Sequence, residues 1–159
     1  MGGSSSGLLC SAAQVLRSGL NDCELCRGAA GERVAGSPRW RVVRVDDASF
    51  PAYYRVIWNA HAAEFTDLAP AERAECMEVV AGVERVLREQ LQPTKVNLAS
   101  LGNMVPHLHW HVIARFEWDS HFPGPVWAQA RRAVEPAAVT RLAVPLEQVD
   151  LAVRAALNA

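Results

Sequence analysis

Three histidines alternate with apolar residues in one short segment of this 159-residue chain: His107, His109 and His111. A β-strand repeats every two residues, so this spacing predicts that the three imidazoles share one face of a strand. Leu108 and Trp110 then point to the opposite face and towards the core. A row of imidazoles is costly to bury without partners. The row therefore indicates a site for an anion, a metal ion or a reacting phosphorus.

The segments that must position these histidines have the patterns of an antiparallel sheet with one main helix. Strands are expected over residues 40–45, 53–58, 95–101 and 107–116, where β-branched and aromatic residues gather. The turn residues Gly102 and Asn103 join the last two strands, which favours an antiparallel pair. The glycines over residues 28–36 indicate a turn.

The helix patterns complete an α+β class. Apolar residues recur at helical spacing over residues 71–91, charged residues occupy the other face, and Pro70 stands in the first turn. A short helix is expected over residues 146–157. The predicted architecture is an antiparallel sheet with this one main helix and a C-terminal helical tail, about residues 128–159.

Length, composition and charge restrict the class of protein. The length fits a single domain, expected over residues 21–159 after a flexible Gly/Ser-rich extension over residues 1–20. The formal net charge of −1 gives no indication of nucleic-acid binding. No apolar run approaches the roughly 18 residues that cross a bilayer, and the first residues lack the basic start of a signal peptide. These observations predict a cytoplasmic protein with reduced thiols and no membrane partner.

The histidine row and its flanking segments resemble those of the histidine triad (HIT) family. The segment 107–113 follows the pattern His-apolar-His-apolar-His-apolar-apolar, and a C-x-x-C pair at Cys23 and Cys26 lies near the start, as in the zinc-carrying bacterial branch. Residues 51–57 are similar to the family's Pro-Gly-His-x-Leu-Val-Ile strand. Asn97 and the Gly-Asn pair precede the triad, and residues 122–127 are similar to the segment that follows it. The resemblance spans roughly residues 23–127, which is most of the chain.

The resemblance implies cleavage of a nucleoside monophosphate from an NMP-X substrate, such as a dinucleoside polyphosphate or an adenylated compound. The middle histidine, His109, would be the nucleophile and would form a covalent nucleotidyl-histidine. His107 and His111 would flank the phosphate and donate hydrogen bonds to its oxygens. Asn103 stands where the family has a glutamine and is a further catalytic candidate. The expected substrate is a purine nucleotide.

The substrate-binding candidates implied by the resemblance are amides, one acid and one tyrosine. Asn97 and Asn103 carry amides that could reach a phosphate oxygen. An acid in the turn at Asp46 or Asp47 would hold the ribose hydroxyls, and Asp46 is taken as the candidate. Tyr53 stands where the family has a fourth histidine that supports the triad through hydrogen bonding.

The resemblance also implies a structural zinc ion and a homodimer. The ligands in the zinc-carrying branch correspond to Cys23, Cys26, His61 and His107, a Cys₂His₂ set that suits tetrahedral zinc. An unligated pair of thiols is the alternative for the cysteines. A redox role for the C-x-x-C pair is less favoured because no βαβ unit follows it. A unit of this size would leave a strand edge or a helix face for a second copy to cover.

Two departures from the family pattern leave other functions open. Tyr53 replaces the fourth histidine, and Met104 stands where many relatives have a hydroxyl donor. These differences keep a purine-nucleotide binding module with little turnover as an alternative to an enzyme. A scaffold stabilised by zinc, with purely structural histidines, is the third possibility. Binding and turnover of a nucleotide discriminate among the three.

Overall fold

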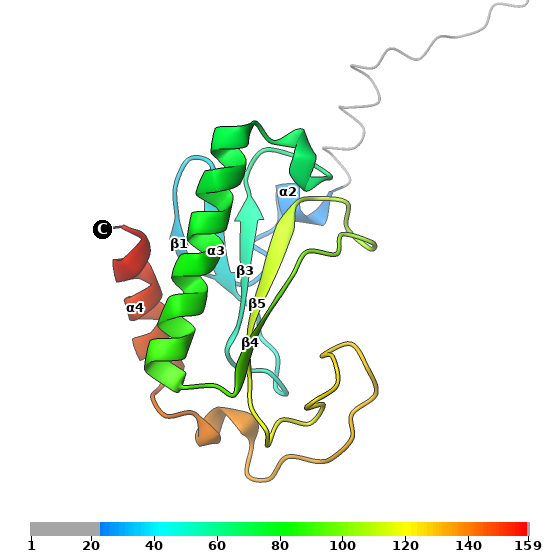
Figure 1. The fold of residues 1–159 in the computed structure, drawn as a ribbon, viewed down its shortest axis with the longest axis vertical. Coiled ribbons are helices and arrows are strands. Elements are labelled where there is room, and N and C mark those ends of the chain that lie inside the picture. The colour runs from blue at the N-terminus through cyan, green and yellow to red at the C-terminus, as the bar shows by residue number, and fades with distance from the viewer. Residues whose placement is uncertain (1–22, 159) are drawn as a thin grey trace, which may run out of the picture.

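The structure, a computed structural model, describes residues 23–158. A five-stranded antiparallel sheet carries one long helix on a face (Figure 1). The strands lie in the order β1-β2-β3-β5-β4 and are β1 (Glu32–Gly36), β2 (Trp40–Arg44), β3 (Tyr53–Trp58), β4 (Lys95–Ala99) and β5 (His109–Arg115). The α-helices are α2 (Glu24–Arg27), α3 (Pro70–Leu91) and α4 (Leu146–Leu157). The predicted α+β class is confirmed, whereas the predicted extension over residues 1–20 lies outside the described residues.

Helix α3 forms because a start signal, an apolar stripe and a stop signal agree. Pro70 is its first residue, and the Ala69 N–H donates to the Glu72 carboxylate at 2.9 Å. Gln92 ends the helix in the left-handed conformation, and Pro93 follows. The apolar stripe is buried against the sheet face that carries Leu108, Val112 and their neighbours. This face of the sheet is the core, and the histidines occupy the other face.

The prediction of a glycine turn over residues 28–36 is wrong, because Glu32–Gly36 is strand β1 and pairs with β2. Gly31 lies just before the strand with a φ of 143°, and a Cβ there would come 2.4 Å from the Arg44 carbonyl oxygen. The glycine therefore permits a close approach of two strands instead of a turn. The pairing register of β1 with β2 shifts at a bulge between Arg33 and Ala35, and the strand continues on both sides of it.

Helix α4 is fixed to the sheet by a buried polar network. The Asp150 carboxylate accepts a hydrogen bond from the Tyr54 hydroxyl at 2.7 Å and from Arg44 Nε at 3.0 Å. Burial and the adjacent carboxylate raise the pKa of Tyr54 far above its ordinary value, so this hydroxyl remains a donor. Arg154 Nε donates to the Val34 carbonyl of β1 at 2.9 Å. These bonds hold the C-terminal helix over the β1 side of the sheet.

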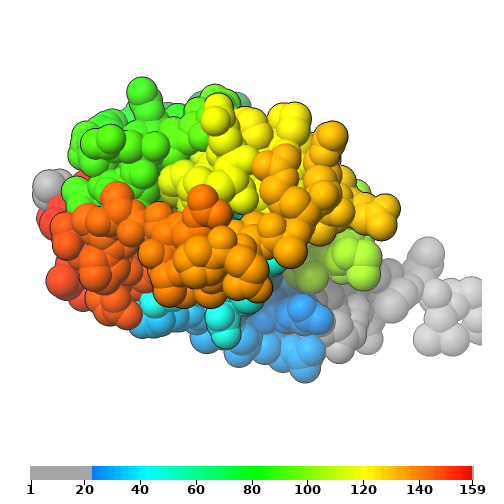
Figure 2. Space-filling view, turned by 90° about the horizontal axis from the view of Figure 1, so that it is seen from below, coloured from blue at the N-terminus to red at the C-terminus, as the bar shows by residue number. Residues whose placement is uncertain are grey.

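The segment between β5 and α4 wraps across one end of the molecule, where it appears in yellow and orange (Figure 2). Its anchor is a buried ion pair between Arg115 Nε and the Asp119 carboxylate at 2.7 Å. Arg115 also donates to the Gly124 carbonyl at 2.9 Å and to the Asn97 side chain at 2.6 Å. The anchor brings Trp127 over the histidine face. Within residues 23–158, no helix combines the length and the apolar character needed to span a membrane.

Candidate active site

Strand β5 places His109 and His111 on the sheet face opposite α3, at the floor of a cavity of about 450 Å³. Cross-strand pairing sets their neighbours: Ile57 lies opposite His109, and Arg55 lies opposite His111. The loop after β4 closes one side of the cavity, and Trp127 closes another. The lining residues are Glu24, Leu25, Arg55, Leu101, Gly102, Asn103, Met104, Val105, His109, His111 and Trp127.

His109 has the geometry of a nitrogen nucleophile. Its Nδ1 lies 2.6 Å from the main-chain carbonyl oxygen of His107. A carbonyl oxygen can only accept a hydrogen bond, so Nδ1 carries the proton and Nε2 keeps its lone pair. Burial lowers the pKa of His109, and the positive charge of Arg55 lowers it further. The ring is therefore neutral at physiological pH, which is the form that can attack phosphorus.

His111 is held beside His109 by Tyr53 and Trp127. The Tyr53 hydroxyl lies 2.6 Å from His111 Nδ1, and the ring centroids of His109 and His111 are 4.8 Å apart. The indole of Trp127 meets the His111 ring edge-on at 5.3 Å. Burial, together with the charges of His109 and Arg55, lowers the pKa of His111 to about 4. Burial raises the pKa of Tyr53, so both groups of this pair are neutral at physiological pH.

His107 does not line this cavity, although it belongs to the same row in the sequence. It precedes β5, is fully buried, and its Nε2 lies 2.6 Å from the Trp58 carbonyl oxygen. That carbonyl fixes the proton on Nε2, so Nδ1 is free to act as a ligand. Nδ1 lies 3.3 Å from Cys23 Sγ and 3.4 Å from Cys26 Sγ. The side chain of His107 thus belongs to a second site behind His109.

The second site gathers four possible metal ligands. The ligand atoms of Cys23, Cys26, His61 and His107 all lie within 4.8 Å of one another. Tetrahedral zinc with bonds of about 2.0–2.3 Å holds its ligand atoms roughly 3.5 Å apart, and the sulfur-to-nitrogen distances of 3.3–3.4 Å at this site match that spacing. Burial, with the adjacent Cys23 thiol, raises the pKa of Cys26. A cation would compensate two thiolates at this site, so the donor set fits zinc.

The other predicted residues are distributed unevenly. Asn103 lines the cavity with His109 and His111. Asn97 lies on the same sheet face but opposite Ile113, and its amide oxygen accepts from Arg115. Asp46 is exposed and does not line the cavity, and Asp47 caps its own turn by accepting from the Ser49 and Phe50 N–H groups. The structure therefore brings Asn103 and Tyr53 to the triad and leaves Asn97 and Asp46 outside the cavity.

The cavity residue that the sequence reasoning missed is Arg55. The sequence pattern places Arg55 within the strand expected over residues 53–58 and assigns it no further role. The signal was present, because the period of two places Arg55 on the face shared by Tyr53 and Ile57. A charged side chain inside an otherwise buried strand was the observation that could have identified it.

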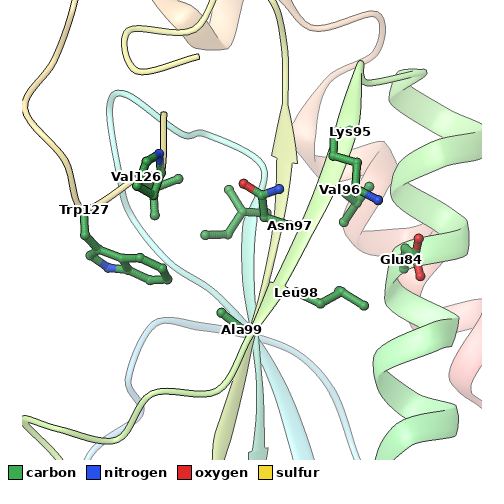
Figure 3. A pocket seen from close by; sticks show the side chains of 10 residues that line it. Glu84, Lys95, Val96, Asn97, Leu98, Ala99, Val126 and Trp127 are labelled. Carbon is green, nitrogen blue, oxygen red and sulfur yellow. The ribbon is translucent and has the colours of Figure 1, made fainter. Parts of the chain in front are cut away.

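A second cavity of about 430 Å³ lies across β4, the outermost strand of the sheet (Figure 3). Asn97 and Trp127 line it on the histidine side, and Leu98 and Glu84 line it on the helix side. The cavity therefore straddles the edge of the sheet instead of entering the protein. It is a surface depression along an open strand edge, next to the histidine cavity and separated from it by Trp127.

Comparisons with known proteins agree on one family. The family model for the HIT domain matches residues 29–118. A solved histidine triad protein from Bradyrhizobium japonicum is 31% identical, with a TM-score of 0.59 over 79% of this chain and 87% of that chain. A histidine triad protein from Sinorhizobium meliloti is 26% identical, with a TM-score of 0.60 over 81% and 88%.

One further solved structure shares the fold at lower identity. It is a zinc-bound histidine triad family protein from Mycobacterium smegmatis, 20% identical, with a TM-score of 0.56 over 87% of this chain and 95% of that chain. The comparison with curated proteins gave no match. The family evidence therefore comes from the domain match and from the more similar solved structures.

Proposed function

The chain belongs to the histidine triad (HIT) family, and we propose that it transfers the nucleoside monophosphate of an NMP-X substrate to water or another acceptor through His109. The observation that carries this proposal is the hydrogen bond between His109 Nδ1 and the His107 carbonyl. It leaves an unprotonated Nε2 beside a cavity of a size that admits a nucleotide.

The proposed reaction has two displacement steps at phosphorus. His109 Nε2 bonds to the α-phosphorus, and the bond from phosphorus to X breaks with its electron pair leaving on X, which takes up a proton. The histidine then carries a positive charge that the His107 carbonyl stabilises through the Nδ1–H. Water or another acceptor attacks the phosphorus and gives up a proton, and the electron pair of the P–N bond returns to Nε2. His111 Nε2–H and the Asn103 amide would donate to the phosphate oxygens.

We expect intact mass spectrometry to detect the nucleotidyl-histidine. The His111→Ala variant, mixed with diadenosine tetraphosphate or adenosine phosphoramidate, should gain the mass of one adenylyl group. Loss of His111 removes a donor that helps turnover of the intermediate, so the adduct should persist longer than in the wild type. The His109→Ala variant should gain no mass. An adduct in the His109→Ala protein would refute the assignment, and AMP binding without adduct or AMP release would favour a binding module.

We further propose that Cys23, Cys26, His61 and His107 hold one structural zinc ion. The spacing of the ligand atoms and the free Nδ1 of His107 support this assignment. The metal would tie α2 to the sheet, and it would hold the ring of His107 while the main chain of the same residue orients the nucleophile. No step of the proposed reaction passes through the metal. Reduced thiols suit a reducing compartment such as the cytoplasm.

We propose that the protein is a homodimer that pairs along β4. Strand β1 at the other edge is engaged by α4 through the Arg154 bond, whereas no strand among residues 23–158 lies beyond β4. Exposed apolar side chains gather near this edge, namely Leu98, Leu101, Met104 and Trp127. An open edge with apolar flanks is suited to pairing with a second copy.

Light scattering coupled to size exclusion checks the dimer. The wild type should have the mass of two chains, and Leu98→Lys should shift it to one, because a lysine on an edge strand opposes pairing. Leu151→Lys is the matched control, since Leu151 is 60% exposed on α4, away from β4. It should leave the dimer intact. A monomeric wild type at micromolar concentration would contradict the proposal.

A further inference from the structure

Arg55 places a positive charge in the histidine cavity at a position where the family pattern has leucine. It lies on β3 directly opposite His111, and its side chain is partly buried. It lines the cavity with both His109 and His111. Its guanidinium carbon lies 5.5 Å from the centre of the Tyr53 ring. Its positive charge contributes to the low pKa of His111, as expected for a cation near that ring.

Nothing in the described part of the chain neutralises this cation. Of the ion pairs found over residues 23–158, none involves Arg55. Its Nε is buried and has no hydrogen-bond partner there. Among the described residues, Glu24 is the only carboxylate that lines the cavity, and it makes no ion pair with Arg55. Tyr53, the aromatic neighbour of Arg55, cannot neutralise the guanidinium either, because burial raises the pKa of this phenol and keeps it uncharged.

An unpaired and partly buried guanidinium is unfavourable until an anion binds it. Five N–H donors in a planar fork match the oxygens of a phosphate better than a single amine does. The opposite wall of the cavity supplies the Asn103 amide, whereas the Met104 side chain can donate nothing. The hydrogen-bond donors near the histidines therefore come from Arg55 on β3 and from Asn103 in the loop after β4.

We propose that Arg55 binds the non-bridging oxygens of the phosphate that His109 attacks, and that it makes this cavity select a phosphorylated ligand over the bare nucleoside. The inference rests on the proposed function for the identity of that phosphate. Arg55 supplies the charged donor on the β3 side that the methionine at position 104 cannot supply from the loop. It acts in both binding and turnover, because the charge on these oxygens persists into the transition state.

Calorimetric titration with AMP and with adenosine tests the assignment directly. Arg55→Met removes the charge at similar length, Arg55→Lys keeps the charge without the fork, and Arg85→Met removes an exposed arginine on α3 as the matched control. Arg55→Met should weaken AMP binding by about 10- to 100-fold, the usual range for a charged hydrogen-bond pair, and should leave adenosine binding unchanged. Arg55→Lys should lose less, and Arg85→Met should bind like the wild type.

The outcomes separate this inference from the proposed function. Equal AMP affinity in Arg55→Met and the wild type overturns the role of Arg55, even if His109 forms the adenylyl adduct. Equal losses for AMP and adenosine, or a drop in the melting temperature that Arg55→Lys does not restore, assign Arg55 to the fold and overturn it also. A wild type that binds neither AMP nor pyrophosphate overturns it as well. Selective loss of AMP binding supports it whether or not the protein turns over either adenylated substrate.

Discussion

His109→Ala is expected to lower the rate of AMP release from diadenosine tetraphosphate by roughly 10³- to 10⁶-fold. The substitution removes the imidazole at the cavity floor whose Nε2 is unprotonated because its Nδ1–H donates to the His107 carbonyl. Without it the two displacement steps have no covalent intermediate, and what remains is attack by water on a bound substrate. AMP should still bind, because Arg55, His111 and Asn103 are unchanged.

Steady-state release of AMP, with active protein quantified by AMP titration, checks this prediction. His121→Ala is the matched control, because His121 lies outside the cavity and its Nδ1 contacts the Ser120 hydroxyl at 2.8 Å. It should retain the wild-type rate. If His109→Ala and the wild type release AMP at the same rate in protein free of contaminating hydrolases, His109 is not the nucleophile.

Removal of the proposed zinc ion should produce the largest change in stability. We expect one zinc ion per chain, and we expect chelation to lower the free energy of unfolding by roughly 3 kcal/mol and the melting temperature by roughly 6–12 °C. Zinc-finger peptides lose about 10–16 kcal/mol because they have no other core. Here the main core between α3 and the sheet persists without the metal, and the small cluster of Cys23, Leu25, Val43 and Ile57 loses its tether.

Metal analysis, thermal melting and hydrogen exchange check this result together. Cys26→Ala should abolish zinc binding and reproduce the lower melting temperature, and a chelator should then have no further effect on that variant. Exchange should rise around α2 and remain slow in α3. Wild-type protein that lacks zinc as purified, and that gains neither metal nor stability when zinc is supplied, would refute the site.

The period-two and helical patterns predicted most of the scaffold because burial enforces them. The strands at 40–44 and 53–58 and the helix at 70–91 lie close to their expected positions. Strand β1 was missed because Gly31 and Gly36 resemble turn residues, and only the close contact with β2 shows why they are needed. Side-chain alternation cannot reveal such a contact between distant segments.

The candidate site was predictable in composition and less so in geometry. The row of three histidines divides, because His107 lies before the strand and turns towards the cysteines while the other two remain in the cavity. The position of Asn97 in the sequence suits an amide donor to phosphate, but in the structure its side-chain oxygen accepts a hydrogen bond from Arg115. The charge of Arg55 within an apolar strand is visible in the sequence, but only the pairing of β3 with β5 shows that Arg55 lies opposite His111. Each difference depends on tertiary partners that a linear pattern does not contain.

The ring and the main-chain carbonyl of His107 make different contacts, and this affects how substitutions of the three histidines are interpreted. Its ring faces the cysteines, while its carbonyl oxygen holds the ring of His109. A substitution at 107 changes only the ring and keeps the carbonyl, so any loss of turnover would report displacement of the main chain instead of a missing third imidazole. Alanine substitution of each histidine would therefore report a structural change at His107 but a loss of cavity side chains at His109 and His111. Substitution of Cys26 or His61 separates them, because neither residue contributes an atom to the cavity.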